Sequence, residues 1–311
     1  MVHAPPIRER DPQSILHRRC DPCPSPLSCG PVGVGCRCHP GIAVIPTWHP
    51  HFDLWILLFI LGFGYWYVNV RIRAHTIPAT PGPTQRQWWQ WYMALALMWF
   101  VSGWPLHDIG EESLFTVHMV EHIVLALVVP PLLLMGTPRW LADATLGHPK
   151  VAAWLRPIAR PVPAFVLFNT IFILIHWPTM VEMMLGNQLA HFVIHSLLFF
   201  SAVLMWMPVL SPTMAIPKIS RPSQMLYLFA QSLLPAIPAS FLTFSTVAIY
   251  PVYGAAALEW GLDPVTDQTI SGIVMKLGGS FILWITIAVI WFRWTSEERE
   301  WEEINTSVPT S

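Results

Sequence analysis

Histidines at helical spacing are the residues of this chain whose types and positions most directly predict chemistry. His118 and His122 are separated by four residues, and so are His191 and His195. Side chains four residues apart share one face of a helix, roughly 5–6 Å apart at Cβ. Two such pairs on neighbouring helices would place up to four imidazoles around one centre. Imidazole suits copper, zinc, iron and nickel, so the spacing indicates a transition-metal site.

Other side chains that could bind or support a metal occur at the same level of the predicted fold. Thioethers favour Cu(I), and carboxylates serve as ligands or as partners of ligating histidines. These residue types alone leave copper, zinc, iron and nickel open. A single histidine near a helix end is more often a hydrogen-bonded residue, and a methionine is more often part of the packing. The predicted metal ligands are His118, His122, His191, His195, His107 and His176, with Met119, Asp108 and Glu121 as supporting candidates.

The first histidine pair also allows an enzymatic interpretation. The five residues from His118 to His122 read H-x-x-E-H, which matches an inverted zinc-protease motif. An intramembrane zinc hydrolase that uses Glu121 as its general base is therefore the main alternative, although so short a match arises easily by chance in a histidine-rich chain. A haem carrier with ligands paired across helices, such as His118 with His191, and a transporter are further alternatives.

The elements that must position these side chains are transmembrane helices. The chain of 311 residues is 54% hydrophobic and 11% charged, with a mean hydropathy of +0.49, whereas a soluble domain carries about 25% charged residues. Apolar segments of near-spanning length, for which about 20 residues suffice, recur along it. The fold class is thus all-α, a polytopic membrane protein with seven transmembrane helices, at residues 52–70, 88–106, 113–135, 162–178, 187–209, 225–249 and 269–293.

The connections between these helices predict the orientation. Those after the first, third and fifth helices hold nine Lys or Arg residues, whereas those after the second, fourth and sixth hold none. Basic connections lie in the cytoplasm by the positive-inside rule. The N-terminus is then outside, the C-terminus is cytoplasmic, and the candidate histidines lie near the outer face. The net charge of −1 gives no indication of a nucleic-acid partner.

The remaining features concern the domain boundaries and the interior of two helices. Residues 1–47 form a predicted disordered Pro- and Cys-rich tail, or result from a start codon assigned too far upstream. Residues 48–295 form the membrane domain, and residues 296–311 an acidic cytoplasmic tail. Pro235 and Pro238 predict a kink in the sixth helix. Lys276 lies inside the seventh, where it either pairs with Glu121, lines a wet cavity or extends toward the membrane surface.

Several segments resemble a known family. These are Trp48–His51, Pro105–Pro138, Leu189–Val209 and Asp267–Met275, and they occur in consistent order across residues 48–295. They are similar to the CtaG family of caa3-type cytochrome c oxidase assembly factors. The chain departs from the family at Glu121, where Gln is common, and after Met275, where a Trp-x-Pro is common.

The resemblance implies a non-enzymatic role in the assembly of a haem–copper oxidase, with copper delivery at the outer face of the membrane. The partners that it implies are the lipid bilayer, the oxidase subunits and periplasmic copper chaperones. The location that it implies is the bacterial plasma (inner) membrane.

Overall fold

Helices make up nearly all of the regular structure in this computed structural model, which describes residues 48–307. The described part of the chain contains no strand. The predicted tail of residues 1–47 lies outside the described residues. The elements of the first half are α1 (Phe52–Tyr67), η2 (Val68–Ile72), α2 (Arg73–Thr76), α3 (Gln85–Ser102), α4 (Leu106–Glu112), α5 (Phe115–Ile123), η3 (Val124–Val128), α6 (Val129–Gly136), α7 (Arg139–Thr145) and α8 (Pro149–Ile158).

The second half contains the longest helix. This is α16, which runs through the start of the predicted acidic tail, so that residues 296–307 continue the last helix. The elements are α9 (Pro161–Ile175), α10 (Pro178–Gly186), α11 (Gln188–Leu210), α12 (Arg221–Leu233), α13 (Ala236–Phe244), η4 (Pro251–Tyr253), α14 (Gly254–Glu259), α15 (Pro264–Ile273), η5 (Val274–Gly278) and α16 (Gly279–Ser307).

All seven predicted transmembrane segments fall on helices, but fewer pass a strict test for spanning a membrane. Among the described residues, five helical segments are long and apolar enough, and a sixth is added if α8 and α9, bent by 71° to each other, form one span. The helix α3 is not among them, because Gln85, Arg86, Gln87 and Gln90 lower the hydropathy of its first two turns. The five segments are 52–76, 115–136, 188–210, 221–244 and 264–301.

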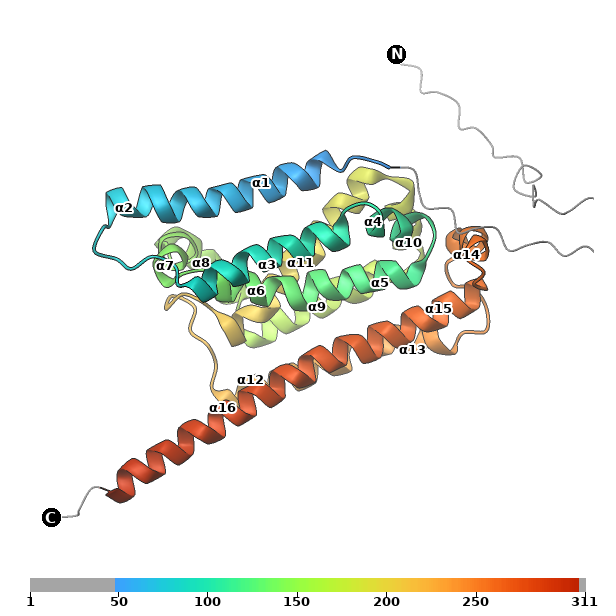
Figure 1. The fold of residues 1–311 in the computed structure, drawn as a ribbon. Coiled ribbons are helices and arrows are strands. Elements are labelled where there is room, and N and C mark those ends of the chain that lie inside the picture. The colour runs from blue at the N-terminus through green and yellow to red at the C-terminus, as the bar shows by residue number, and fades with distance from the viewer. Residues whose placement is uncertain (1–47, 308–311) are drawn as a thin grey trace, which may run out of the picture.

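The long helices run side by side, so that their connections gather at two ends of the bundle (Figure 1). We call the end that carries α4, α10 and α14 the acidic end, and the end that carries α2, α7 and α8 the basic end. The three connections without Lys or Arg meet at the acidic end. His118 and His191 lie in the first turns of their helices at that end, as the sequence predicted.

Proline explains the irregular turn that follows the first histidine pair. Pro130 has no N–H to donate to the carbonyl of Ala126, four residues earlier. The chain adopts a π-helical turn at Val124–Val128, and the indole N–H of Trp206 donates to the oxygen of Ala126 at 3.1 Å. A helix of the second half thus satisfies the group that proline leaves without a donor, which ties α11 to this turn.

Buried polar side chains connect other helices. The amide of Asn169 in α9 donates to Oε1 of Gln231 in α12 at 2.7 Å, and Tyr227 donates its hydroxyl proton to the oxygen of Met205 in α11 at 2.8 Å. Such bonds between membrane helices are each worth about 0.6–2 kcal/mol. The predicted kink coincides with an interruption of the helix at Leu234 and Pro235, between α12 and α13.

Candidate metal centre

The first histidine pair is positioned by a contact between distant parts of the chain. The residue before α5, Leu114, has no side chain that can cap the helix. Asp267 of α15 supplies the cap instead: its carboxylate accepts from the backbone N–H of Phe115 at 2.8 Å and of Thr116 at 3.2 Å. The hydroxyl of Thr116 donates to the same carboxylate at 2.6 Å. Because His118 follows one turn later, this cap fixes the depth and rotation of the pair.

The second pair is positioned by a cap within its own helix. The side chain of Asn187 accepts from the backbone N–H groups of Leu189 and Ala190 at the start of α11. Asparagine is among the best capping residues, so α11 begins at a defined place. His191 lies in the first turn after that cap and His195 in the second.

Three of these imidazoles converge across two helices. We call His118, His122 and His195 the inner triad; one nitrogen from each lies within 4.8 Å of the others. The Nε2 atoms of His122 and His195 are 3.2 Å apart. The ring centroids of His118 and His122 are 4.3 Å apart, and those of His118 and His195 are 5.5 Å apart. The two helix faces that the spacing predicted therefore face each other.

The geometry of the inner triad suits a transition-metal ion. Metal–nitrogen bonds of about 2.0–2.1 Å place ligand nitrogens roughly 3.4 Å apart, a separation that the His122–His195 pair already has. His118 and His122 are buried, and the Nδ1 atom of each has no hydrogen-bond partner among the described residues. A site with three protein ligands keeps a coordination position open. Such a site can accept an ion and release it again, and it can also activate water.

A second group lies beside the inner triad, toward the acidic end. We call His107, Glu111 and His191 the outer group; one ligand atom from each lies within 4.8 Å of the others. A carboxylate oxygen of Glu111 contacts both imidazoles. The Nε2 atom of His191 is 2.7 Å from that of His195, so the two groups are in direct contact.

The outer group is an ion-paired cluster. Burial by itself would lower the pKa of His107, but the carboxylates of Glu121 and Glu111 outweigh burial and raise it to about 11. Protonated His107 therefore forms ion pairs with both acids, and a metal ion must displace that proton before it can bind there. The inner triad, which consists of imidazoles alone, is the better first candidate for the metal.

Asp108 and Glu121, two of the supporting candidates, contact partners outside the inner triad. Nε2 of His51 lies 2.8 Å from Asp108, which also contacts His49 at 3.5 Å. Glu121 accepts from the hydroxyl of Ser102 at 2.8 Å and contacts Nδ1 of His107 at 3.0 Å. The pairing of Glu121 with Lys276 that we considered is thus replaced by contacts with α3 and α4.

His176 lies beside the triad without joining it. Its Nδ1 atom contacts the backbone oxygen of Phe172 at 2.6 Å, and its ring centroid is 6.1 Å from that of His122. Sequence reasoning did not include Glu111 among the candidate ligands. The four-residue spacing between His107 and Glu111 is the signal that could have found it.

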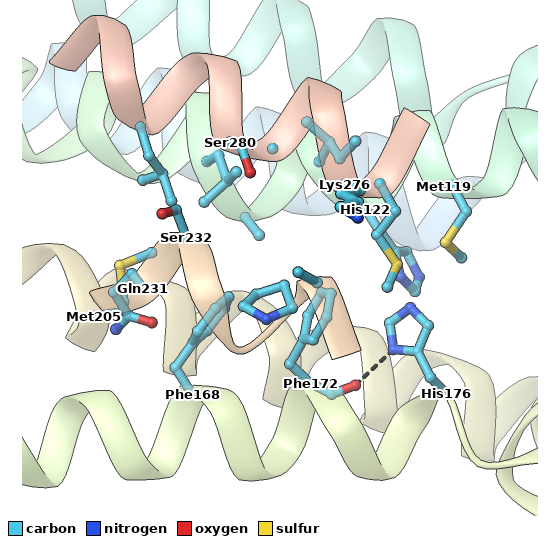
Figure 2. A pocket seen from close by; sticks show the side chains of 18 residues that line it. Met119, His122, Phe168, Phe172, His176, Met205, Gln231, Ser232, Lys276 and Ser280 are labelled. Carbon is cyan, nitrogen blue, oxygen red and sulfur yellow. Dashed lines mark hydrogen bonds between the residues drawn. The ribbon is translucent and has the colours of Figure 1, made fainter. Parts of the chain in front are cut away.

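A small cavity lies beside His122 of the inner triad (Figure 2). His122 and His176 lie at one end, and Lys276 and the buried Met119 also line it. Its volume of about 40 Å³ is enough for a few water molecules. Lys276 therefore lines a cavity whose wall is mostly apolar, with His122, His176 and Gln231 among its few polar residues.

Fold and site together define a class: a polytopic helical membrane protein with clustered imidazoles at one end of the bundle. The chain belongs to a known family within that class, the cytochrome c oxidase caa3 assembly factor (CtaG) family, which it matches over residues 63–297. That match covers all three members of the inner triad.

Relatives in mycobacteria resemble the chain more distantly. An uncharacterized protein of Mycobacterium bovis is 26% identical over 232 residues, which are 67% of this chain and 34% of that protein. An uncharacterized protein of Mycobacterium leprae is 24% identical over 272 residues, 77% of this chain and 38% of that protein. The chain thus spans about a third of the length of these curated relatives. No solved structure matches it significantly.

Proposed function

We propose that this protein is a non-enzymatic assembly factor of cytochrome c oxidase that receives copper at the outer face of the bacterial plasma membrane and passes it to the oxidase. The observation that carries this proposal is the convergence of His118, His122 and His195 on one point from two helices. The family description supports the assembly role. Copper is the favoured ion and zinc the alternative, since imidazole binds both.

The two histidine groups suit a protein that transfers its ion. An ion arriving from outside meets the outer group first, because that group includes two residues of the connecting helix α4. Contact between His191 and His195 then offers a path to the inner triad without an intervening gap. The proposed partners are the subunits of a haem–copper oxidase, periplasmic copper chaperones as donors, and the lipid bilayer.

The second candidate function is an intramembrane zinc hydrolase, which the open coordination position of the inner triad would permit. Its general base would be Glu121. Contacts with Ser102 and His107 engage the Glu121 carboxylate, which favours the assembly role.

A deletion strain tests the proposed function and separates it from hydrolysis. In copper-poor medium, cells without the gene should synthesise the oxidase subunits at normal levels and show at least about tenfold lower oxidase activity and copper content in the oxidase. Added copper should restore part of both. Normal oxidase activity in the deletion strain without added copper would contradict the assembly role.

Complementation with Glu121→Gln completes that experiment. Glutamine keeps an acceptor for Ser102 and is the common family residue, so the variant should restore most of the oxidase activity. A hydrolase would lose its general base and a factor of about 10²–10⁴ in rate. Failure of Glu121→Gln to complement, with normal amounts of protein in the membrane, would favour the hydrolase.

We also propose that the membrane domain, residues 48–295, crosses the bilayer seven times, with the N-terminus outside and residues 296–311 in the cytoplasm. Five spans are long and apolar, α8 and α9 form a bent sixth, and α3, with 18 residues, is the seventh. The gathering of the basic connections at one end of the bundle supports this orientation.

Cysteine labelling checks the orientation. All five native cysteines lie between residues 20 and 38, so they can be replaced by serine without changing the membrane domain. In intact cells, a membrane-impermeant maleimide should label Glu182→Cys in α10 and should not label Lys150→Cys in α8 until the membrane is opened. The reverse pattern would place the histidine groups on the cytoplasmic side.

A further inference from the structure

A large cavity near the basic end is separate from both histidine groups. It lies between α3, α6, the end of α11, the segment that follows α11, and α16, and its volume is about 1060 Å³. Cavities of about 300–1000 Å³ bind small molecules in other proteins. This one is therefore large enough for a molecule far bigger than a metal ion.

The wall of the cavity is apolar where it faces the membrane interior. Leu132 of α6, Trp206 of α11 and Ile282 of α16 line it there. Such a wall offers nothing to a small soluble anion, which would remain at the entrance. It suits a hydrocarbon chain.

The entrance at the basic end is cationic. Two of its five basic residues are neutralised: Arg139 lies 3.6 Å from Asp143, and Arg221 lies 3.2 Å from Glu297. The other three, Arg86, Lys218 and Arg293, take part in none of the ion pairs among the described residues.

The positive charges at this entrance repel one another. Partial burial and the neighbouring Arg221 together lower the pKa of Lys218. A bound anion would relieve that repulsion.

We infer that this cavity binds an anionic phospholipid, with its phosphate at Arg86, Lys218 and Arg293 and an acyl chain along the apolar wall. Basic pockets between transmembrane helices on the cytoplasmic side suit such headgroups, and each Lys or Arg near the membrane surface contributes about 1 kcal/mol. The inference does not depend on copper or on the oxidase.

Native mass spectrometry of the purified full-length protein tests it. The probes are phosphatidylglycerol, phosphatidylcholine and inorganic phosphate, each added to delipidated protein. We expect one phosphatidylglycerol to be retained at least about tenfold more strongly than phosphatidylcholine, and phosphate alone to leave the thermal unfolding midpoint unchanged. Equal retention of the two lipids would overturn the inference. A rise of the thermal unfolding midpoint with inorganic phosphate as large as the rise with phosphatidylglycerol would also overturn the inference, because it would indicate a site for small anions.

Matched variants locate the site. The triple variant Arg86→Gln/Lys218→Gln/Arg293→Gln should lose the preference for phosphatidylglycerol by about tenfold or more. The triple variant Lys150→Gln/Arg156→Gln/Arg160→Gln removes the same charge from residues of the basic end that do not line the cavity, and it should keep the preference. An equal loss in both would show a general attraction to anionic lipid and refute a defined site.

A third variant tests the site independently, in case the triple variant of Arg86, Lys218 and Arg293 does not fold. Ile282→Trp narrows the apolar wall without changing any charge, so it should weaken lipid retention while phosphate still has no effect. Retention equal to that of the unaltered protein would contradict a chain lying along this wall. The unfolding midpoint of each lipid-free variant shows whether the fold is intact.

Discussion

Purified protein that carries His122→Ala and His195→Ala together is expected to retain no stoichiometric copper after dialysis. The two substitutions remove the imidazoles whose Nε2 atoms are 3.2 Å apart and leave His118 as the only member of the inner triad. Each lost ligand costs about 3 kcal/mol of binding free energy, so the affinity should fall roughly 10⁴-fold.

Two controls make this experiment specific. The parent protein should carry serine at the five tail cysteines, because thiolates bind copper and would hide a loss at the triad. The matched variant His75→Ala/His148→Ala also removes two imidazoles, both exposed and both at the basic end, and it should bind copper like the parent. Equal copper content in all three proteins would refute the inner triad as the copper site. Competition with zinc then reports which ion the site prefers.

The part of the site that could be predicted from sequence is the part that depends on spacing within one helix. A separation of four residues puts His118 with His122 and His191 with His195 on common faces, whatever surrounds them. How far each helix is rotated against its neighbours is set by packing. That rotation sends His195 into the inner triad and His191 mainly toward Glu111.

His176 illustrates the same limit. At the end of α9 it is at the predicted level, but its ring contacts a carbonyl of its own helix. The sequence spacing cannot distinguish a hydrogen bond to a backbone carbonyl from metal binding, because an imidazole near a helix end can do either.

In the fold as well, local features could be predicted from the sequence, whereas features that depend on packing between helices could not. All seven segments predicted from apolar composition fall on helices, and five of them are long and apolar enough to span a membrane among the described residues, since apolar composition is a local property. Hydropathy could not predict that α9, the helix expected at residues 162–178, would be bent by 71° against α8. It also could not predict the three π-helical turns within the apolar segments. The partner of the Ala126 carbonyl is Trp206, eighty residues away, so that turn depends on tertiary contact.

Asp267→Ala is expected to lower the free energy of unfolding by about 3 kcal/mol, the largest effect on stability that we predict for a single substitution. Asp267 is 1% exposed, and no residue of α5 can replace it as the cap. Its removal leaves the buried backbone N–H of Phe115 and the partly buried N–H of Thr116 without this acceptor. Asp267→Asn keeps one of the two oxygens and should cost about half as much.

The neighbouring Asp263 provides the control for that substitution. It caps α15, its own helix, by accepting from the backbone N–H groups of Val265 and Thr266 in an exposed position, where water can replace it. Asp263→Ala should therefore cost only about 1 kcal/mol. Thermal unfolding in detergent measures both variants, and copper titration of the folded fraction should show weaker binding only for Asp267→Ala, because that cap fixes the position of His118 and His122. If the two aspartates cost the same and leave copper binding unchanged, then α5 is held by its packing alone, and the contact from α15 does not position the metal centre.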